Sequence, residues 1–367
     1  MKRITSIILA LVMLLSCLAM TACGDRTPPA LTLEGHKVTE AQYSYWASSY
    51  KANYLNSYED VENSAEYWQS EISEGMTVAE YLDGVTLETV KSTLVNSMLF
   101  DEYGLSFTKD EKASIDAYIS DLIIERADGS KNMMNALLGE YGINLNILKN
   151  IYLEEEKVAK VYNHLFGEGG EKALTDEELE KFYTENFVRV QMIYIENIST
   201  YSTDDNGNRL TDENGYYVVE KLKGEEKEKK DAVVKTVQEK IAAGEDFDKL
   251  YEEYSELKDY KNGHYYSATE NYGDAFYYLL IADVTKLEVG EIATLESEMG
   301  TCIVKKLELD SGAWSNKENE AFFGEFKDNA SETAYRLFVE SYYEKIETDE
   351  AIIKKYSVAN VTPAYFF

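Results

Sequence analysis

The distribution of proline is the feature that most constrains how this chain can fold. The chain has three prolines among 367 residues, and none lies between Pro29 and Pro363. Proline removes a backbone donor and interrupts helices and sheets, so a body without it can form long helices and regular strands. Hydrophobic residues make up 44% of the chain, which is enough for more than one core.

Helix-start signals recur through the first half of this body. Four segments fit the capping-box pattern, in which a threonine and a Glu or Gln three residues later satisfy each other's backbone donors: Thr39–Gln42, Thr77–Glu80, Thr108–Glu111 and Thr175–Glu178. Apolar residues at helical spacing follow, as in Val90, Leu94 and Met98. Gly104 and Gly142 stand where helix ends favour glycine. We therefore expect residues 37–187 to form a helical domain.

The pattern changes at Val188 and indicates a small α+β domain over residues 188–310. The signals are a β-branched strand at Val188–Ile195, a helix over about 225–243 that Gly244 ends, a shorter helix from Asp246 and a strand at Gly300–Leu307. Two Asn-Gly turn signals, at 205–207 and 213–215, predict a hairpin insertion at about 199–222.

Residues 311–367 return to a helical pattern, with Phe323, Phe326 and Leu337 among the core candidates. We expect this C-terminal helix to complete the core that the N-terminal helices begin. The predicted fold class is thus α+β, with a mostly helical domain split in sequence around an inserted α+β module.

The N-terminus carries the features of a bacterial export signal. Lys2 and Arg3 precede an apolar run from Ile7 to Ala19 that is too short to span a bilayer comfortably, and small residues then lead to Cys23. We expect residues 1–22 to be a signal peptide, Cys23 to be lipidated and residues 23–36 to be a tether. The mature chain would then sit on the outer face of the cell membrane, with Cys302 unpaired. The alternative is an ordinary cleaved signal peptide with a chance cysteine.

The net charge of −32 argues against a nucleic-acid partner, because phosphate binding needs clustered lysine and arginine. It also argues against adhesion to anionic lipid headgroups. The simpler interpretation is that the negative charge keeps the protein soluble outside the cell. The alternative is that it attracts cationic unfolded chains.

Three stretches resemble the parvulin (PpiC-type) family of peptidyl-prolyl isomerases. They are Val233 to Ser255 with its core Ala243–Leu250, Leu287 to Ile292, and Met299 to Leu307. Upstream, Thr175 to Phe187 resembles the helix that leads into this domain in PrsA-like foldases, and Gly35 to Tyr45 resembles the opening of a SurA-type domain. The resemblance implies a lipoprotein foldase or chaperone of a Gram-positive bacterium that acts on unfolded or partly folded exported proteins. It implies no cofactor and no metal, and a homodimer stays open.

The resemblance also marks candidate site residues. Met192 and Cys302 stand where parvulins carry histidines, and Leu257 stands at a third catalytic position of the family. The resemblance assigns Phe276 and Leu280 to the prolyl pocket. His264, Tyr265 and Tyr266 lie near the expected groove, and Tyr277-Tyr278 and Tyr342-Tyr343 are candidates for client contact.

The chemistry of these replacements favours a peptide-binding module with weak or absent isomerase activity. Rotating an X–Pro amide faces a barrier of about 20 kcal/mol, which a site lowers by binding the twisted amide better than the planar one. A thioether is a weak acceptor and a thiol is a poor substitute for imidazole. Ordinary core filling is the competing interpretation of Met192 and Cys302. Two other functions stay open: an active isomerase with an altered site, and a transporter's substrate-binding lipoprotein built from βαβ units.

Overall fold

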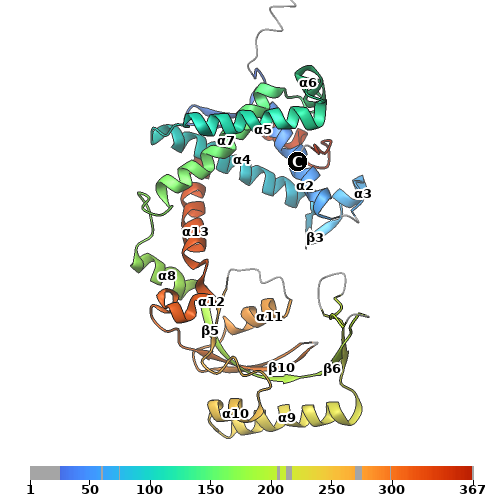
Figure 1. Cartoon of the computed structure of the whole chain (residues 1–367), viewed down its shortest axis with the longest axis vertical. Coiled ribbons are helices and arrows are strands. Elements are labelled where there is room, and N and C mark those ends of the chain that lie inside the picture. The colour runs from blue at the N-terminus through green and yellow to red at the C-terminus, as the bar shows by residue number, and fades with distance from the viewer. Residues whose placement is uncertain are drawn as a thin grey trace, which may run out of the picture. The chain divides into compact units, whose positions relative to one another are not determined.

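The computed structural model describes residues 25–58, 61–73, 75–204, 207–211, 217–268, 275–297 and 299–365, with the side chains of 275–279 left out. Within these ranges the chain forms two compact units (Figure 1). The helical unit comprises the chain up to Ala173 and from Ser331 onward, and the sheet unit comprises Leu174–Ala330. The helical part is therefore split around an inserted α+β module, which confirms the predicted fold class. Cys23 lies outside the described residues, so its lipidation stays a prediction.

The helical unit contains short strands and a series of helices. Its elements are β1 (Pro29–Leu33), β2 (His36–Thr39), α2 (Glu40–Ser57), α3 (Ala65–Trp68), β3 (Glu71–Ser73), β4 (Met76–Thr77), α4 (Val78–Glu102), α5 (Lys109–Ala127), α6 (Lys131–Gly139), α7 (Leu145–Leu165), most of α13 (Phe326–Glu340), η3 (Tyr343–Lys345), β11 (Glu347–Thr348) and α14 (Glu350–Lys355).

All four predicted capping boxes are present and begin α2, α4, α5 and α8 (Asp176–Asn186). In the first of them, the backbone N–H of Thr39 donates to Gln42 Oε1 at 2.9 Å, and the N–H of Gln42 donates to Thr39 Oγ1 at 3.3 Å. Gly104 and Gly142 have φ of 62° and 76°, so both occupy the left-handed region that follows a helix end. Local sequence signals therefore predict where these helices begin and end.

The core of the helical unit forms where α4 and α7 pack together, and α2, α5 and α13 contribute to it. Val90 and Leu94 of α4, Leu148 and Ile151 of α7 and Val339 of α13 are all buried in one apolar cluster. Tyr335 of α13 also donates from its hydroxyl to Asn96 Oδ1 of α4 at 2.6 Å. The C-terminal segment contributes to this core only from Ser331 onward: residues 311–330, with Phe323 and Phe326, belong to the sheet unit, and Leu337 is 55% exposed.

The segment read as a tether contains a strand. Residues 29–33 form β1, which lies between β2 and β11 in a three-stranded antiparallel sheet, and Ala30, Leu31 and Leu33 are buried. The expectation of a tether up to residue 36 is therefore wrong from Pro29 onward. The paired prolines suggested a linker, but proline is tolerated at the first residue of a strand, where Pro29 stands.

The sheet unit is built on a four-stranded antiparallel sheet with the order β8-β5-β10-β9. Its elements are α8, β5 (Phe187–Glu196), β6 (Ile198–Tyr201), β7 (Val219–Lys221), α9 (Gly224–Ala242), α10 (Phe247–Tyr254), β8 (His264–Ser267), α11 (Ala275–Val284), β9 (Ile292–Glu296), β10 (Gly300–Leu307), η1 (Ala313–Ser315), η2 (Lys317–Asn319), α12 (Glu320–Phe323) and the start of α13. The strand predicted at Gly300–Leu307 is β10, residue for residue.

Helices lie on both faces of this sheet. Figure 1 shows α9 and α10 together on one side and α11 on the other. Apolar residues from both faces, including Ile193, Leu250 and Leu280, belong to one buried cluster. A second, aromatic cluster gathers α8, β8, α12 and the start of α13 around Tyr183 and Phe326. The excursion predicted at about 199–222 is framed by the antiparallel strands β6 and β7; its two turn signals lie mostly outside the described residues.

Candidate functional site

The register of the sheet brings Met192 and Cys302 together. Cys302 of β10 lies opposite Tyr194 of β5, and Met192 lies opposite Val304. Directly opposed residues share a face, as do residues two apart on one strand. Met192 and Cys302 are therefore diagonal neighbours on one face. The neighbouring Gln191 hydrogen-bonds α10 from the opposite face, which leaves Met192 and Cys302 on the face covered by α11 (Figure 1).

Both side chains are enclosed by apolar neighbours. Met192 is 2% exposed and Cys302 is fully buried, in a cluster that includes Val190, Val304 and Leu280 of α11. Burial raises the pKa of the Cys302 thiol to about 12. The thiol is therefore protonated at neutral pH, and since the thiolate is the reactive form, Cys302 has no nucleophilic role here. Met192 and Cys302 fill space in the apolar core of the sheet unit.

Leu257 differs from this pair in its exposure to solvent. It is 38% exposed, in the loop that joins α10 to β8. The neighbouring Ser255 is buried and fixes this loop to the sheet: its hydroxyl accepts from Tyr194 N–H at 3.1 Å and donates to the carbonyl of Leu257 at 2.7 Å. Of the three family positions, Met192 and Cys302 are therefore buried in the sheet, and Leu257 is partly exposed in a loop.

The three candidates on β8 divide between the two faces of the sheet. Tyr266 pairs with Val188 and His264 with Val190, whereas Tyr265 pairs with Arg189, one residue out of phase. Tyr265 packs in the aromatic cluster, and its hydroxyl donates to Asp310 Oδ2 at 2.9 Å. Tyr265 therefore does not share a groove with Tyr266.

His264 and Tyr266 are held together through Tyr260. The ring of His264 stacks on that of Tyr260 with 4.0 Å between centroids, and the hydroxyls of Tyr260 and Tyr266 are 2.6 Å apart. Partial burial lowers the pKa of His264, so its ring is neutral at pH 7. Leu280 is fully buried on α11, while the side chain of Phe276 lies outside the described residues. Of the two residues assigned to the prolyl pocket, only Leu280 can therefore be placed, and it belongs to the buried cluster of the sheet unit.

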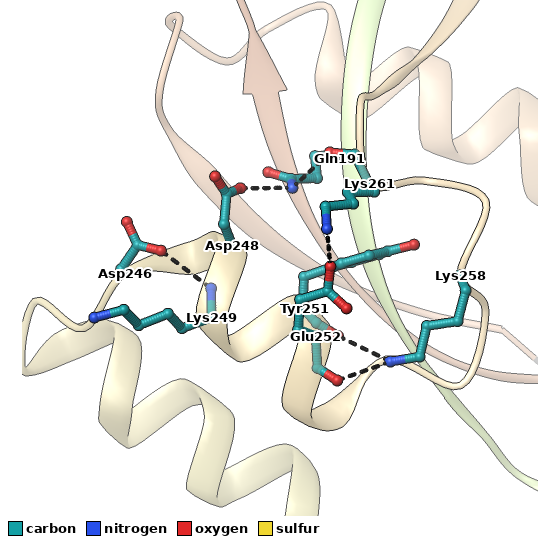
Figure 2. A network of polar contacts seen from close by, with 8 residues as sticks. All are labelled: Gln191, Asp246, Asp248, Lys249, Tyr251, Glu252, Lys258 and Lys261. Atoms are coloured by element: carbon teal, nitrogen blue, oxygen red, sulfur yellow. Dashed lines mark hydrogen bonds and ion pairs between the residues drawn. The ribbon is translucent and has the colours of Figure 1, made fainter.

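A polar network on the opposite face positions α10 and the loop that follows it (Figure 2). Gln191 is buried beside Met192 and donates from Nε2 to Asp248 Oδ1 at 2.8 Å and to the carbonyl of Lys261 at 3.0 Å. Lys258 donates to the carbonyl of Glu252 at 2.9 Å, which satisfies an unpaired acceptor at the end of α10. This network is structural: it holds the loop that carries Leu257 and leads to His264. A buried amide in an apolar strand was the signal for Gln191, and the sequence analysis did not use it.

A second candidate site lies on the helical unit and was missed by the sequence analysis. Around the end of α2, the β3–β4 hairpin and the start of α4, four large apolar side chains are 42–54% exposed: Tyr58, Ile72, Met76 and Tyr81. We call these four residues the apolar patch. In the sequence the four residues flank Trp68, Val78 and Leu82, which form a buried cluster, and Tyr54 packs against that cluster. The ring of Tyr54 lies 4.8 Å from that of Tyr58 and 5.8 Å from that of Trp68.

Of the two pairs proposed for client contact, only Tyr342-Tyr343 can be placed. Tyr342 and Tyr343 pack partly against the core of the helical unit, and the side chains of Tyr277 and Tyr278 lie outside the described residues. The signal for the apolar patch was the density of aromatic residues between Tyr50 and Tyr81. Its meaning depends on exposure, which sequence spacing alone does not supply.

Within the described ranges, no three His, Cys, Asp or Glu side chains are placed to hold a metal ion. Over the same residues, no helix has the length and apolar character needed to cross a membrane.

The solved structures similar to this chain include PrsA proteins and SurA-like chaperones. PrsA from Bacillus subtilis is 16% identical, with 78% of this chain and 93% of that chain covered and a TM-score of 0.24. PrsA from Bacillus cereus, described as a peptidylprolyl isomerase, is 16% identical, with 79% and 97% covered and a TM-score of 0.28. A structure of SurA-like chaperones from Campylobacter jejuni is 11% identical, with 88% and 100% covered and a TM-score of 0.23.

No protein-family model matches the chain, and no curated protein matches it. The solved structures carry the names of the foldases whose motifs the sequence resembles. At these identities and scores, the argument for function rests on the residues of this chain.

Proposed function

We propose that this protein is an extracytoplasmic, lipid-anchored chaperone that binds unfolded exported polypeptides and does not catalyse prolyl isomerisation. The export signal and Cys23 support its place at the membrane. Polypeptide binding is assigned to the helical unit, and the sheet unit is assigned the role of a peptide-binding module that keeps a parvulin-like pattern without its polar site.

The apolar patch is the observation that carries the chaperone assignment. Exposed large hydrophobic residues that gather on one surface are typical of interaction sites. Tyr58, Ile72, Met76 and Tyr81 combine aromatic rings with flexible aliphatic chains, which suits contact with many different apolar segments. The net charge of −32 adds attraction for cationic stretches and keeps a chaperone with such a surface soluble.

The burial of Met192 and Cys302 supports the absence of isomerase activity. Catalysis requires groups that bind the twisted amide better than the planar one. At the two adjacent positions where parvulins carry histidines, this chain places a thioether and a protonated thiol inside an apolar cluster. Neither provides a strong hydrogen bond or a charge to the pocket.

The two alternatives are weaker. An active isomerase with an altered site would need a new polar group, and the nearest candidate, His264, is engaged by the ring of Tyr260 and lies 3.1 Å from the carbonyl of Asp259 through Nε2. A transporter's binding protein built from βαβ units would contain parallel strands. All strand pairs in the described part of the chain are antiparallel.

The chaperone assignment is tested by light scattering of an aggregating unfolded client. The variant Ile72→Ser with Met76→Ser removes half of the apolar patch, and we expect it to lose most of the protection that the wild type gives. The variant Ile124→Ser with Met133→Ser is the matched control, because it removes the same residue types from exposed positions of α5 and α6. Equal protection by both variants would rule out the apolar patch as the client site.

The catalytic part of the proposal needs a separate assay. We expect the isomerisation of a proline reporter peptide to stay uncatalysed, with a time constant of roughly tens to hundreds of seconds at 25 °C. Clear acceleration that is lost in Phe276→Ala would instead establish an active isomerase.

A further inference from the structure

The last described residues form an irregular segment, Ser357–Tyr365, which we call the C-terminal tail. It follows α14 and turns through Ser357, whose carbonyl accepts from Asn360 N–H at 2.8 Å. It then runs along α2, whose Ser48 and Lys51 hydrogen-bond its backbone. The contacts of the C-terminal tail lie within the helical unit.

The C-terminal tail is held mainly by its backbone. Val358 N–H donates to Asp83 Oδ1 at 2.7 Å, and Ala364 N–H donates to the carbonyl of Ser48 at 2.9 Å. The carbonyl of Val361 accepts from Lys51 Nζ at 2.9 Å. Groups that bind backbone N–H and C=O accept many sequences, because every residue except proline offers both.

Two further contacts hold the C-terminal tail. Tyr141 donates from its hydroxyl to the carbonyl of Pro363 at 3.4 Å, which adds a fourth backbone atom. Ser357 adds a side-chain hydrogen bond to Asp83.

Only two side chains of the C-terminal tail are fully buried, and both are small. Val358 fills the cluster of Trp68, Val78 and Leu82, and Ala364 enters the main core of the helical unit. Between them, Asn360 and Thr362 are exposed. The arrangement places a small aliphatic residue at two buried points and leaves Asn360 and Thr362 between them exposed.

The groups that hold the C-terminal tail include a buried cation. Lys51 is only 3% exposed, and its ammonium lies 4.9 Å from the centroid of the Trp68 ring. Burial lowers the pKa of Lys51, which shows how far this cation is removed from water. We call Ser48, Lys51, Trp68, Asp83 and Tyr141 the tail groove. Its Trp68 end is continuous with the apolar patch through Tyr54.

We propose that the tail groove is a binding site for polypeptide backbone, that the C-terminal tail is its built-in occupant, and that a client segment with small aliphatic residues binds there in its place. The proposal rests on the proposed function and names the kind of segment that the helical unit takes. The C-terminal tail is itself the template: a short irregular peptide, held through N–H and C=O groups and anchored by Val358 and Ala364.

The test measures the binding of a labelled synthetic peptide with the sequence of residues 357–365 to the full chain. Val358→Asp places a carboxylate in the apolar cluster and frees the C-terminal tail. Asn360→Asp adds the same charge at an exposed position and is the matched control. When the C-terminal tail occupies the site in most molecules, the apparent affinity for an added peptide falls in proportion to the fraction of molecules whose site is free. We therefore expect Val358→Asp to bind the peptide at least about tenfold more tightly than the wild type and Asn360→Asp. Adding Lys51→Met to Val358→Asp should reverse that gain.

Equal affinity of a folded Val358→Asp chain and the control would overturn the proposal. If circular dichroism shows that Val358→Asp does not fold, Val358→Ala replaces it, with a smaller gain in the same direction expected; no gain there is equally decisive. The client-aggregation assay on the wild type separates this inference from the proposed function. Protection without peptide binding rejects the tail groove alone, and peptide binding without protection rejects the chaperone assignment alone.

Discussion

At the level of single residues, Met192 and Cys302 behave as apolar side chains do in any buried strand: they fill space. Packing also explains other residues of the motif that surrounds them. Gly300 illustrates this. A Cβ at this position would lie 2.5 Å from the carbonyl oxygen of Ile195 and 2.7 Å from Cε2 of the Tyr194 ring. Packing alone therefore explains the glycine in the resembling motif.

We predict that Gly300→Ala destabilises the sheet unit. Overpacking a dense site costs about 1–3 kcal/mol, and here one of the opposing atoms belongs to the backbone, which cannot rotate away. Urea unfolding followed by the fluorescence of Trp314 measures the effect. Gly84→Ala is the control with the opposite sign, because Gly84 lies inside α4 with no atom near its absent Cβ. Alanine there should raise the stability of the helical unit by up to about 1 kcal/mol. An unchanged Gly300→Ala midpoint would contradict the close packing at Tyr194.

At the level of elements, the capping boxes differ in charge, and that difference gives them different pH dependence. The box of α2 uses the neutral Gln42, whereas that of α8 uses Glu178. The backbone N–H of Thr175 donates to the carboxylate of Glu178 at 2.9 Å and holds its pKa below its usual value. A pKa lowered by folding contributes stability above the unfolded value, and that stability is lost as pH falls through the folded value.

We therefore predict that Glu178→Gln lowers the urea midpoint of the sheet unit at pH 7 and lowers it less at pH 3, because the wild-type carboxyl loses its charge as pH falls through its folded pKa. Glu177→Gln serves as the matched control, since Glu177 lies in the same first turn outside the box. Losses of equal size for Glu178→Gln at both pH values would mean that the charge of Glu178 does not stabilise α8.

Elements were predictable from the sequence where their signals are local. Threonine and glutamate three residues apart fix a helix start, and a β-branched run fixes β5. β1 and β11 were missed because both are short, and β11 forms only by pairing with β1, more than 300 residues away in the chain: Leu31 lies opposite Thr348. The candidate site followed the same rule. Met192 and Cys302 could be placed from motifs, whereas the apolar patch and the tail groove depend on exposure and long-range contacts.

At the level of the whole molecule, the chain contains separate cores joined by two crossings of the backbone. Each unit buries its own apolar clusters, with Val90 and Leu94 in one and Ile193 and Ile303 in the other. The three tryptophans divide between them: Trp46 and Trp68 belong to the helical unit and Trp314 to the sheet unit. Cooperative all-or-none unfolding is typical of single domains and fails for chains with independent cores.

We predict that the two units unfold at different denaturant concentrations. A chain with Trp314 as its only tryptophan, made by Trp46→Phe and Trp68→Phe, reports the sheet unit, and a Trp314→Phe chain reports the helical unit. Gly300→Ala should shift only the transition seen by Trp314, and Val90→Ala, which opens a cavity in the core of the helical unit, should shift only the transition seen by Trp46 and Trp68. If both variants moved both transitions equally, the units would be unfolding as one. The split helical unit, whose two halves are contributed by opposite ends of the chain, would then owe its stability to the module inserted between them.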